Sequence, residues 1–314
     1  MSPTGKAQLQ IHFCVLLWGF TAILGKLISL PALPLVQWRM LLVAAALALL
    51  PRVWRGLRAL PPRLVLAYAG IGVLVALHWL TFYGAIKLSN ASVGATCMAL
   101  GSVFVALLEP WLARTRLSRR DLALGLLALP GVVLVVGGVP HGMRAGIAVG
   151  ALSALLVALF GALNKRLVEH GDPLTVTAIE LGAGGLALLL LAPLLALLAP
   201  AFSAGGLLPP LPGARDAGLL LVLAVACTLL PFALALVALR HMSAFAQQLA
   251  VNLEPVYAIV LAILLLGEQR ELSPGFYLGV AIILAAVFLH PLFGRPKRLQ
   301  PEVLGASEAK GAAE

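Results

Sequence analysis

The chain has 314 residues, of which 61% are hydrophobic and only 11% charged, and its mean hydropathy is +1.04. A soluble protein of this length has no core large enough to bury so much apolar surface, so the composition excludes a water-soluble globular protein and makes lipid the solvent. The formal net charge of +10 is spread between apolar runs, which argues against a nucleic-acid-binding surface.

Ten apolar runs have about the length that crosses 30 Å of hydrocarbon as a helix. They are His12–Leu30, Leu35–Leu50, Leu64–Ile86, Ala91–Ala113, Leu122–Gly138, Ala145–Leu163, Leu174–Leu198, Ala217–Leu239, Ala244–Leu266 and Gly275–Phe293. The runs are too long for strands and do not alternate. The second run is short and has the least defined ends. The predicted fold class is an all-α polytopic membrane protein with ten transmembrane helices.

Basic residues give the expected orientation of these spans. With a cytoplasmic N-terminus, sixteen of the 22 Lys and Arg residues fall on the cytoplasmic side and six on the other. The six are Lys26, Arg39, Lys87, Arg144, Arg215 and Arg270. Because cytoplasmic loops carry the excess of Lys and Arg, both termini are predicted to be cytoplasmic.

Weak internal similarity divides the chain in two. At an offset of 139 residues, Leu16-Leu17 falls on Leu155-Leu156, Lys26 on Lys165, and Pro34-Leu35 on Pro173-Leu174. At an offset of 153, Lys87 meets Arg240, Ala91 meets Ala244, and Phe104 meets Tyr257. Two five-helix units enter the membrane from opposite sides because five is odd. This predicts inverted repeats at residues 10–138 and 144–293, as in secondary transporters, followed by a disordered cytoplasmic tail at 294–314.

Several motifs resemble the EamA family of the drug/metabolite transporter superfamily. They are Leu16-Leu17-Trp18-Gly19, Leu253-Glu254-Pro255-Val256-Tyr257-Ala258, Leu266-Gly267-Glu268, and in the first half His78-Trp79-Leu80-Thr81-Phe82-Tyr83, Ser89-Asn90-Ala91-Ser92-Val93 and Leu108-Glu109-Pro110. The first half departs from the pattern in reading Ala113-Arg114-Thr115 where the second reads Leu266-Gly267-Glu268. The resemblance implies ten helices and export of amino acids or related metabolites across the bacterial cytoplasmic membrane.

Polar residues in the ninth span are the first site candidates. Glu254 lies near the predicted midplane, and Pro255 frees the backbone carbonyl of Val251. On a continuous helix Gln247 and Glu254 share one face, and Gln248 and Asn252 share the neighbouring one. Since a charge at bilayer depth is costly unless paired or hydrated, this polar arc predicts the lining of a substrate or ion pathway. The alternative is that the amides only bond neighbouring helices.

Other candidates lie in the first, third, sixth and seventh spans. His78 can change charge near neutral pH, and Trp79 and Tyr83 offer rings for a flat or cationic ligand, although a packing histidine beside interfacial aromatics fits equally well. The further candidates are Glu180, Trp18 and Asn164. Arg39 is expected to extend to the outer surface, and Glu109 to pair with the arginines after it.

These features predict a secondary transporter that works by alternating access, with Glu254 exchanging protons for the cargo. An uncoupled facilitator, a membrane-embedded transferase and a non-transporting scaffold stay open as alternatives. No phosphate-binding loop and no Gly-x-Ser-x-Gly sequence occur, and the three cysteines lie in separate spans. We therefore expect no enzymatic activity, no metal and no cofactor. The expected partners are a small-molecule substrate, the lipid bilayer, protons and a second copy of the chain, but no nucleic acid.

Overall fold

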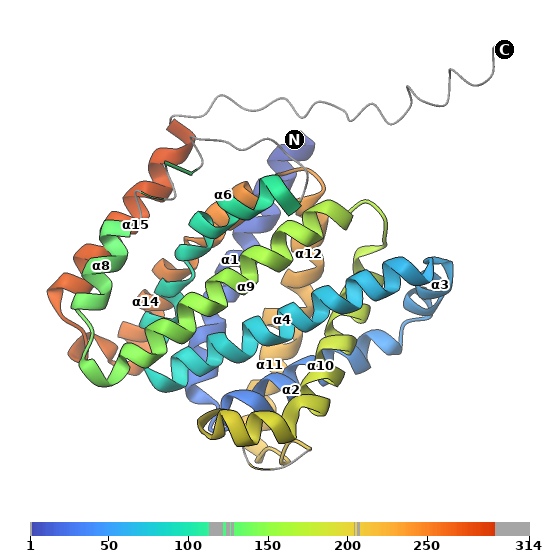
Figure 1. The fold of residues 1–314 in the computed structure, drawn as a ribbon, viewed down its shortest axis with the longest axis horizontal. Coiled ribbons are helices and arrows are strands. Elements are labelled where there is room, and N and C mark those ends of the chain that lie inside the picture. Colours follow the sequence, from blue (N-terminus) through green and yellow to red (C-terminus); the bar gives the residue numbers. More distant parts are fainter. Residues whose placement is uncertain are drawn as a thin grey trace.

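The computed structural model describes residues 2–112, 122–123, 126, 129–203, 205 and 208–292, and every regular element in these ranges is helical (Figure 1). The α-helices are α1 (Pro3–Leu27), α2 (Ala32–Ala48), α3 (Pro51–Ala59), α4 (Pro62–Leu88), α5 (Ala91–Cys97), α6 (Leu100–Leu112), α8 (Leu129–Gly137), α9 (Arg144–Leu167), α10 (Pro173–Leu198), α11 (Ala214–Ala224), α12 (Leu230–Leu239), α13 (Ala244–Val251), α14 (Glu254–Leu266) and α15 (Pro274–Leu292). Short turns of 3-10 helix are η1 (His141–Met143), η2 (Pro200–Phe202) and η4 (Glu268–Arg270), and η3 (Val225–Leu229) is a π-helical turn. The predicted tail at 294–314 and the predicted pairing of the Glu109 side chain lie outside the described residues.

Helical structure follows from the apolar composition, because a backbone in hydrocarbon must satisfy its own N–H and C=O groups. The helix starts carry the expected signals. Asn90, Asp172 and Ser243 each accept a hydrogen bond from a backbone N–H of the first turn that follows them. Proline occupies the first position of helices such as α4 and α10, where its missing N–H costs nothing.

The described residues contain seven helices long and apolar enough to cross a membrane, or eight if the bent pair α2 and α3 is one span. The chain is therefore a multi-pass membrane protein. Three of the ten predicted spans are not among these seven, because too few of their described residues form one long apolar helix. α2 has 17 residues, α8 is described only from Leu129, and the described apolar part of α15 is short. The arrangement of ten spans remains a prediction.

A sharp bend separates the second span from a short surface helix. α2 and α3 meet at 90°, and α3 turns Arg52, Arg55 and Arg58 outward while burying Val53. A short helix with a basic face and one buried apolar residue is suited to lie along a headgroup layer rather than across the bilayer.

Two spans are broken at corresponding positions. α5 gives way to α6 at Met98 and Ala99, and α13 gives way to α14 at Asn252 and Leu253. α5 packs against α14 and α6 against α13, so the two broken spans run antiparallel. Each break lies in the interior of the bundle and interrupts the regular backbone hydrogen bonding there.

The bundle has a compact centre and a paired edge (Figure 1). α4 packs against both α9 and α10, α1 packs against α12 and α14, and α2 packs against α10. α8 and α15 lie side by side at one edge, where Gly131 and Gly279 face each other closely. A Cβ on either glycine would come within about 2.5 Å of the other's carbonyl oxygen.

α4 and α10 approach through glycine backbones. A Cβ on Gly72 would lie 2.1 Å from the carbonyl oxygen of Glu180, and one on Gly184 would lie 2.4 Å from the carbonyl oxygen of Gly72. Small residues let membrane helices come this close. The contact also fixes the backbone that carries Glu180.

The substitution Gly72→Ala should therefore destabilise the folded protein by about 1–3 kcal/mol, because the added methyl group must separate two backbones. Thermal unfolding in detergent measures this. The control is Gly70→Ala on the same helix, where a Cβ meets nothing within 4 Å. Equal unfolding temperatures for the two variants would contradict the close packing of α4 on α10.

Candidate functional site

A central cavity lies among α1, α2, α4, α9, α12, α13 and the start of α14. It has a volume of about 950 Å³, including the space at its mouth. Its wall is mainly apolar and aromatic, with rings from Trp18, Trp79, Phe82, Phe160 and Phe232. Its polar and charged lining residues are Thr21, Arg39, His78, Asn164, Gln247, Gln248 and Glu254. An apolar enclosure with a few convergent polar groups is the usual form of a small-molecule site.

Seven of the ten predicted site residues line this cavity: Trp18, His78, Trp79, Asn164, Gln247, Gln248 and Glu254. The structure thus brings together residues from α1, α4, α9, α13 and α14 that are far apart in the sequence. Tyr83, Glu180 and Asn252 are fully buried but do not line it.

Glu254 is the carboxyl group in the cavity wall. It begins α14 directly after the break at Asn252 and Leu253, and it is 6% exposed. Within the described residues its carboxyl group has no hydrogen-bond partner, and neither Oε1 of Gln247 nor Oδ1 of Asn252 has one. The break therefore concentrates unsatisfied polar groups beside an ionisable side chain.

Arg39 differs from its prediction. The sequence suggested a side chain that extends to the outer surface, but the guanidinium is buried at 2% exposure and lines the cavity. Its Nε donates to Oγ1 of Thr228 at 2.6 Å, and its Nη1 donates to the hydroxyl of Tyr83 at 2.8 Å. The charge also lies over the ring of Trp79, 3.7 Å from the centroid. These neutral partners hold Arg39 inward, so the prediction of an outward-extending side chain was wrong.

The π-helical turn η3 provides a backbone carbonyl that accepts a hydrogen bond from Arg39. Its wider winding changes the hydrogen-bond pattern of α11 and α12, and the carbonyl of Cys227 accepts a bond from Nη2 of Arg39 at 3.3 Å. Thr228 on the same turn donates its hydroxyl hydrogen to the carbonyl of Leu223 at 2.6 Å. The Thr228 oxygen is thereby oriented to accept from Arg39.

His78 is held against α9 by Ser153. Nδ1 of His78 lies 2.8 Å from Oγ of Ser153 and 2.9 Å from its carbonyl oxygen, and Oγ of Ser153 also donates to the carbonyl of His78. Phe160 stands beside the imidazole, with ring centroids 5.5 Å apart. This geometry supports the packing role of His78, although the residue also lines the cavity.

Glu180 and Asn164 form a second buried polar pair. Glu180 has no exposed surface, and Nδ2 of Asn164 approaches its Oε2 at 3.5 Å, a weak contact. Oε1 of Glu180 and Oδ1 of Asn164 have no partner within the described residues. Asn164 also lines the central cavity, so the pair connects to it without opening Glu180 itself.

At one end of the bundle, two carboxylates accept hydrogen bonds from backbone N–H groups of distant segments. Glu268 accepts from the backbone N–H groups of Ala91 and Ser92, both at 3.0 Å, and from Oγ of Ser92 at 2.7 Å. Asp216 accepts from the backbone N–H and the hydroxyl of Ser29. These contacts join the η4 turn to α5 and the start of α11 to the turn after α1.

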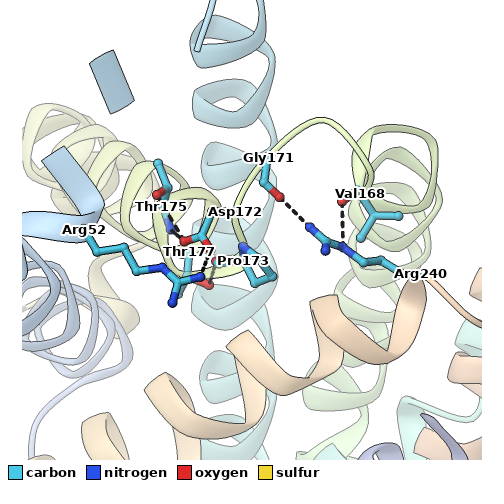
Figure 2. Close-up of polar contacts among 8 residues, drawn as sticks. All are labelled: Arg52, Val168, Gly171, Asp172, Pro173, Thr175, Thr177 and Arg240. Atoms are coloured by element: carbon cyan, nitrogen blue, oxygen red, sulfur yellow. Dashed lines mark hydrogen bonds and ion pairs between the residues drawn. The ribbon is translucent and has the colours of Figure 1, made fainter. Parts of the chain in front are cut away.

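The opposite end has a different set of contacts, shown in Figure 2. Arg240, after α12, donates to the carbonyls of Val168 at 3.2 Å and Gly171 at 2.7 Å in the connection between α9 and α10. Arg52 on α3 forms an ion pair with Asp172, which also caps α10 through Thr175. The loop between α9 and α10 is thus held from two sides.

Sequence reasoning missed three of these residues as functional candidates: Arg39, Asp216 and Glu268. For Arg39 the signal was a charge eight residues into an apolar helix that begins at Ala32. Asp216 looked like an ordinary loop or helix-start residue, and Glu268 belonged to a motif of the family resemblance without an assigned role. Their long-range partners, Ser29 and Ser92, cannot be found from spacing along the chain.

A polytopic helical bundle around a central cavity, with broken helices at that cavity, is typical of membrane transporters. The model of the EamA-like transporter family matches residues 6–137 and 144–290, so this chain belongs to that family of membrane transporters, within the drug/metabolite transporter superfamily. No curated protein matches the sequence. A crystal structure of another protein is similar over 92% of this chain and 97% of its own, with a TM-score of 0.65 and 17% identity, and this likeness supports the fold alone.

Proposed function

We propose that this protein exports small zwitterionic metabolites, above all amino acids, in exchange for protons. The observation that carries the proposal is Glu254, an unpaired carboxyl group in the wall of the central cavity. The wall is largely apolar around few charges, which suits small solutes with an apolar side chain better than sugars or nucleotides. Membership of a transporter family agrees with this reading.

The proposed architecture is ten spans in two inverted five-helix repeats. Several contacts between helices support it, because a contact between two helices has a counterpart between the corresponding helices of the other half. The contact of α1 with α12 corresponds to that of α9 with α4, and the contact of α6 with α9 corresponds to that of α14 with α1. The two family matches and the antiparallel broken spans add to this support.

The proposed location is the cytoplasmic membrane of a bacterium, with both termini in the cytoplasm. Reporter fusions test the orientation. Fusions after Lys87 and after Arg215 should report the outer side, and fusions after Arg58 and after Arg116 the inner side, because Lys and Arg accumulate in cytoplasmic loops. A cytoplasmic signal at Lys87 would contradict the proposed orientation.

Proton exchange at Glu254 gives the transport its proposed direction. An anionic carboxylate in a largely apolar cavity is costly, so Glu254 gains from binding either a proton or the ammonium group of the cargo. The two cannot occupy the same carboxylate at once. Competition between them would couple outward movement of cargo to inward movement of protons when the cavity opens alternately to each side.

Glu254→Gln keeps the shape of the side chain but cannot release a proton. In liposomes offered amino acids, nucleosides and sugars, the variant should lose amino-acid flux driven by a pH gradient and keep part of the exchange at equal pH. Glu169→Gln, a change at an exposed loop carboxylate, is the matched control and should transport as the parent does.

Gradient-driven transport by Glu254→Gln at the parental rate would remove Glu254 as the proton carrier and make Glu180 or His78 the next residue to test. Flux of the parent that ignores the pH gradient would favour an uncoupled facilitator. Selective movement of sugars or nucleosides without amino acids would reject the cargo class.

A further inference from the structure

Arg39 is a buried cation that makes no ion-pair contact, and the opposite charge that attracts it at longer range is that of Glu254. Within the described residues no carboxylate oxygen lies within 4.0 Å of its guanidinium. The ion pair that these residues do form joins Arg52 to Asp172 at the end of the bundle. Its four close partners, Thr228, Tyr83, the carbonyl of Cys227 and the ring of Trp79, are all neutral. A buried charge in a membrane protein is costly unless an opposite charge or water compensates it, so Arg39 leaves part of that compensation to whatever occupies the cavity.

The guanidinium also keeps hydrogen-bonding capacity. Arginine carries five N–H donors, and the structure assigns one bond each to Nε, Nη1 and Nη2. Each Nη atom therefore has one N–H left. Since Arg39 lines the cavity, this pair of donors matches the two oxygens of a carboxylate, which arginine binds in a forked geometry.

The same cavity holds one carboxyl group, Glu254, that does not contact Arg39. A solute with a carboxylate and an ammonium group could meet both charges, one at each residue. The aromatic wall, including Trp79 and Phe232 with ring centroids 6.1 Å apart, then faces the rest of the solute. A structural arginine whose only task was to join α2 to α4 and η3 would not need to face the cavity.

We propose that Arg39 binds the carboxylate of the transported solute and so selects α-amino acids over the corresponding amines and amides. The inference rests on the proposed function, because it concerns the same cavity and the same cargo. It assigns the two ends of the solute: the carboxylate to Arg39 and the ammonium group to Glu254. Trp79 and Tyr83 position the guanidinium rather than contact the solute's charge.

The test compares alanine, leucine, threonine and phenylalanine with their primary amides, in mildly acidic buffer where the amides keep a protonated amine. Uptake into liposomes containing the parent protein should be roughly tenfold faster or more for the acids, because only they bring a charge-assisted partner to Arg39. Arg39→Gln should lose this preference, and Arg39→Lys should keep it with weaker affinity. Arg215→Gln, at an exposed arginine outside the cavity, is the control and should keep the parental preference.

Arg39→Gln removes part of a buried hydrogen-bond network and can impair folding. A second measurement therefore uses only the parent protein, and it is thermal unfolding in detergent. The acids should raise its unfolding temperature and the amides should not. Equal stabilisation or equal transport of acids and amides by the parent would overturn the inference, as would a parental acid preference in folded Arg39→Gln. A parent that moves neither class would overturn the proposed function, and the inference with it.

Discussion

The cost of a charge in hydrocarbon is the constraint on which the interior of this protein depends. Two ionisable groups of opposite sign, Arg39 and Glu254, lie in the wall of one cavity without touching each other. A protein selected only for stability would gain by pairing them or replacing them with apolar side chains. The two charges attract each other without forming an ion pair, so part of the stabilisation of each is left to an occupant of the cavity, which is the physical basis of the proposed transport.

The bundle keeps these groups in place through irregular backbone. The break between α13 and α14 lies immediately before Glu254, and the π-helical turn η3 offers the carbonyl of Cys227 to Arg39. In a regular helix the backbone N–H and C=O groups bond to one another and are not available to a side chain such as Arg39. In a membrane, interrupted backbone is tolerated where it is buried in protein or faces a cavity, and both interruptions are found there.

The difference between the two ends of the bundle also bears on function. At one end Glu268 and Asp216 cap the starts and turns of helices from distant parts of the chain. At the other, Arg240 and the pair of Arg52 with Asp172 hold the single loop between α9 and α10. Capping bonds of this kind can be broken and remade as helices tilt, since water can replace each partner at the membrane surface.

The sequence predicted the helical fold, the family and five of the seven polar and charged residues of the cavity wall, because apolar length and polar residues within apolar spans are visible along the chain. It placed Asn252 on the face of a continuous helix, but α13 ends at Val251, and the buried Asn252 does not line the cavity. It treated Tyr83 as a ring for a ligand, whereas its hydroxyl accepts from Arg39. Both differences depend on contacts between distant segments, which no helical projection contains.

The most direct measurement is proton release on binding of cargo. Purified parent protein in weakly buffered detergent solution should release about one proton for each amino acid bound, because the ammonium group displaces the proton of Glu254. Glu254→Gln should bind more weakly and release none, and Glu169→Gln should behave as the parent does. The same proton release from Glu254→Gln as from the parent would contradict the claim that cargo and proton compete for this carboxyl group.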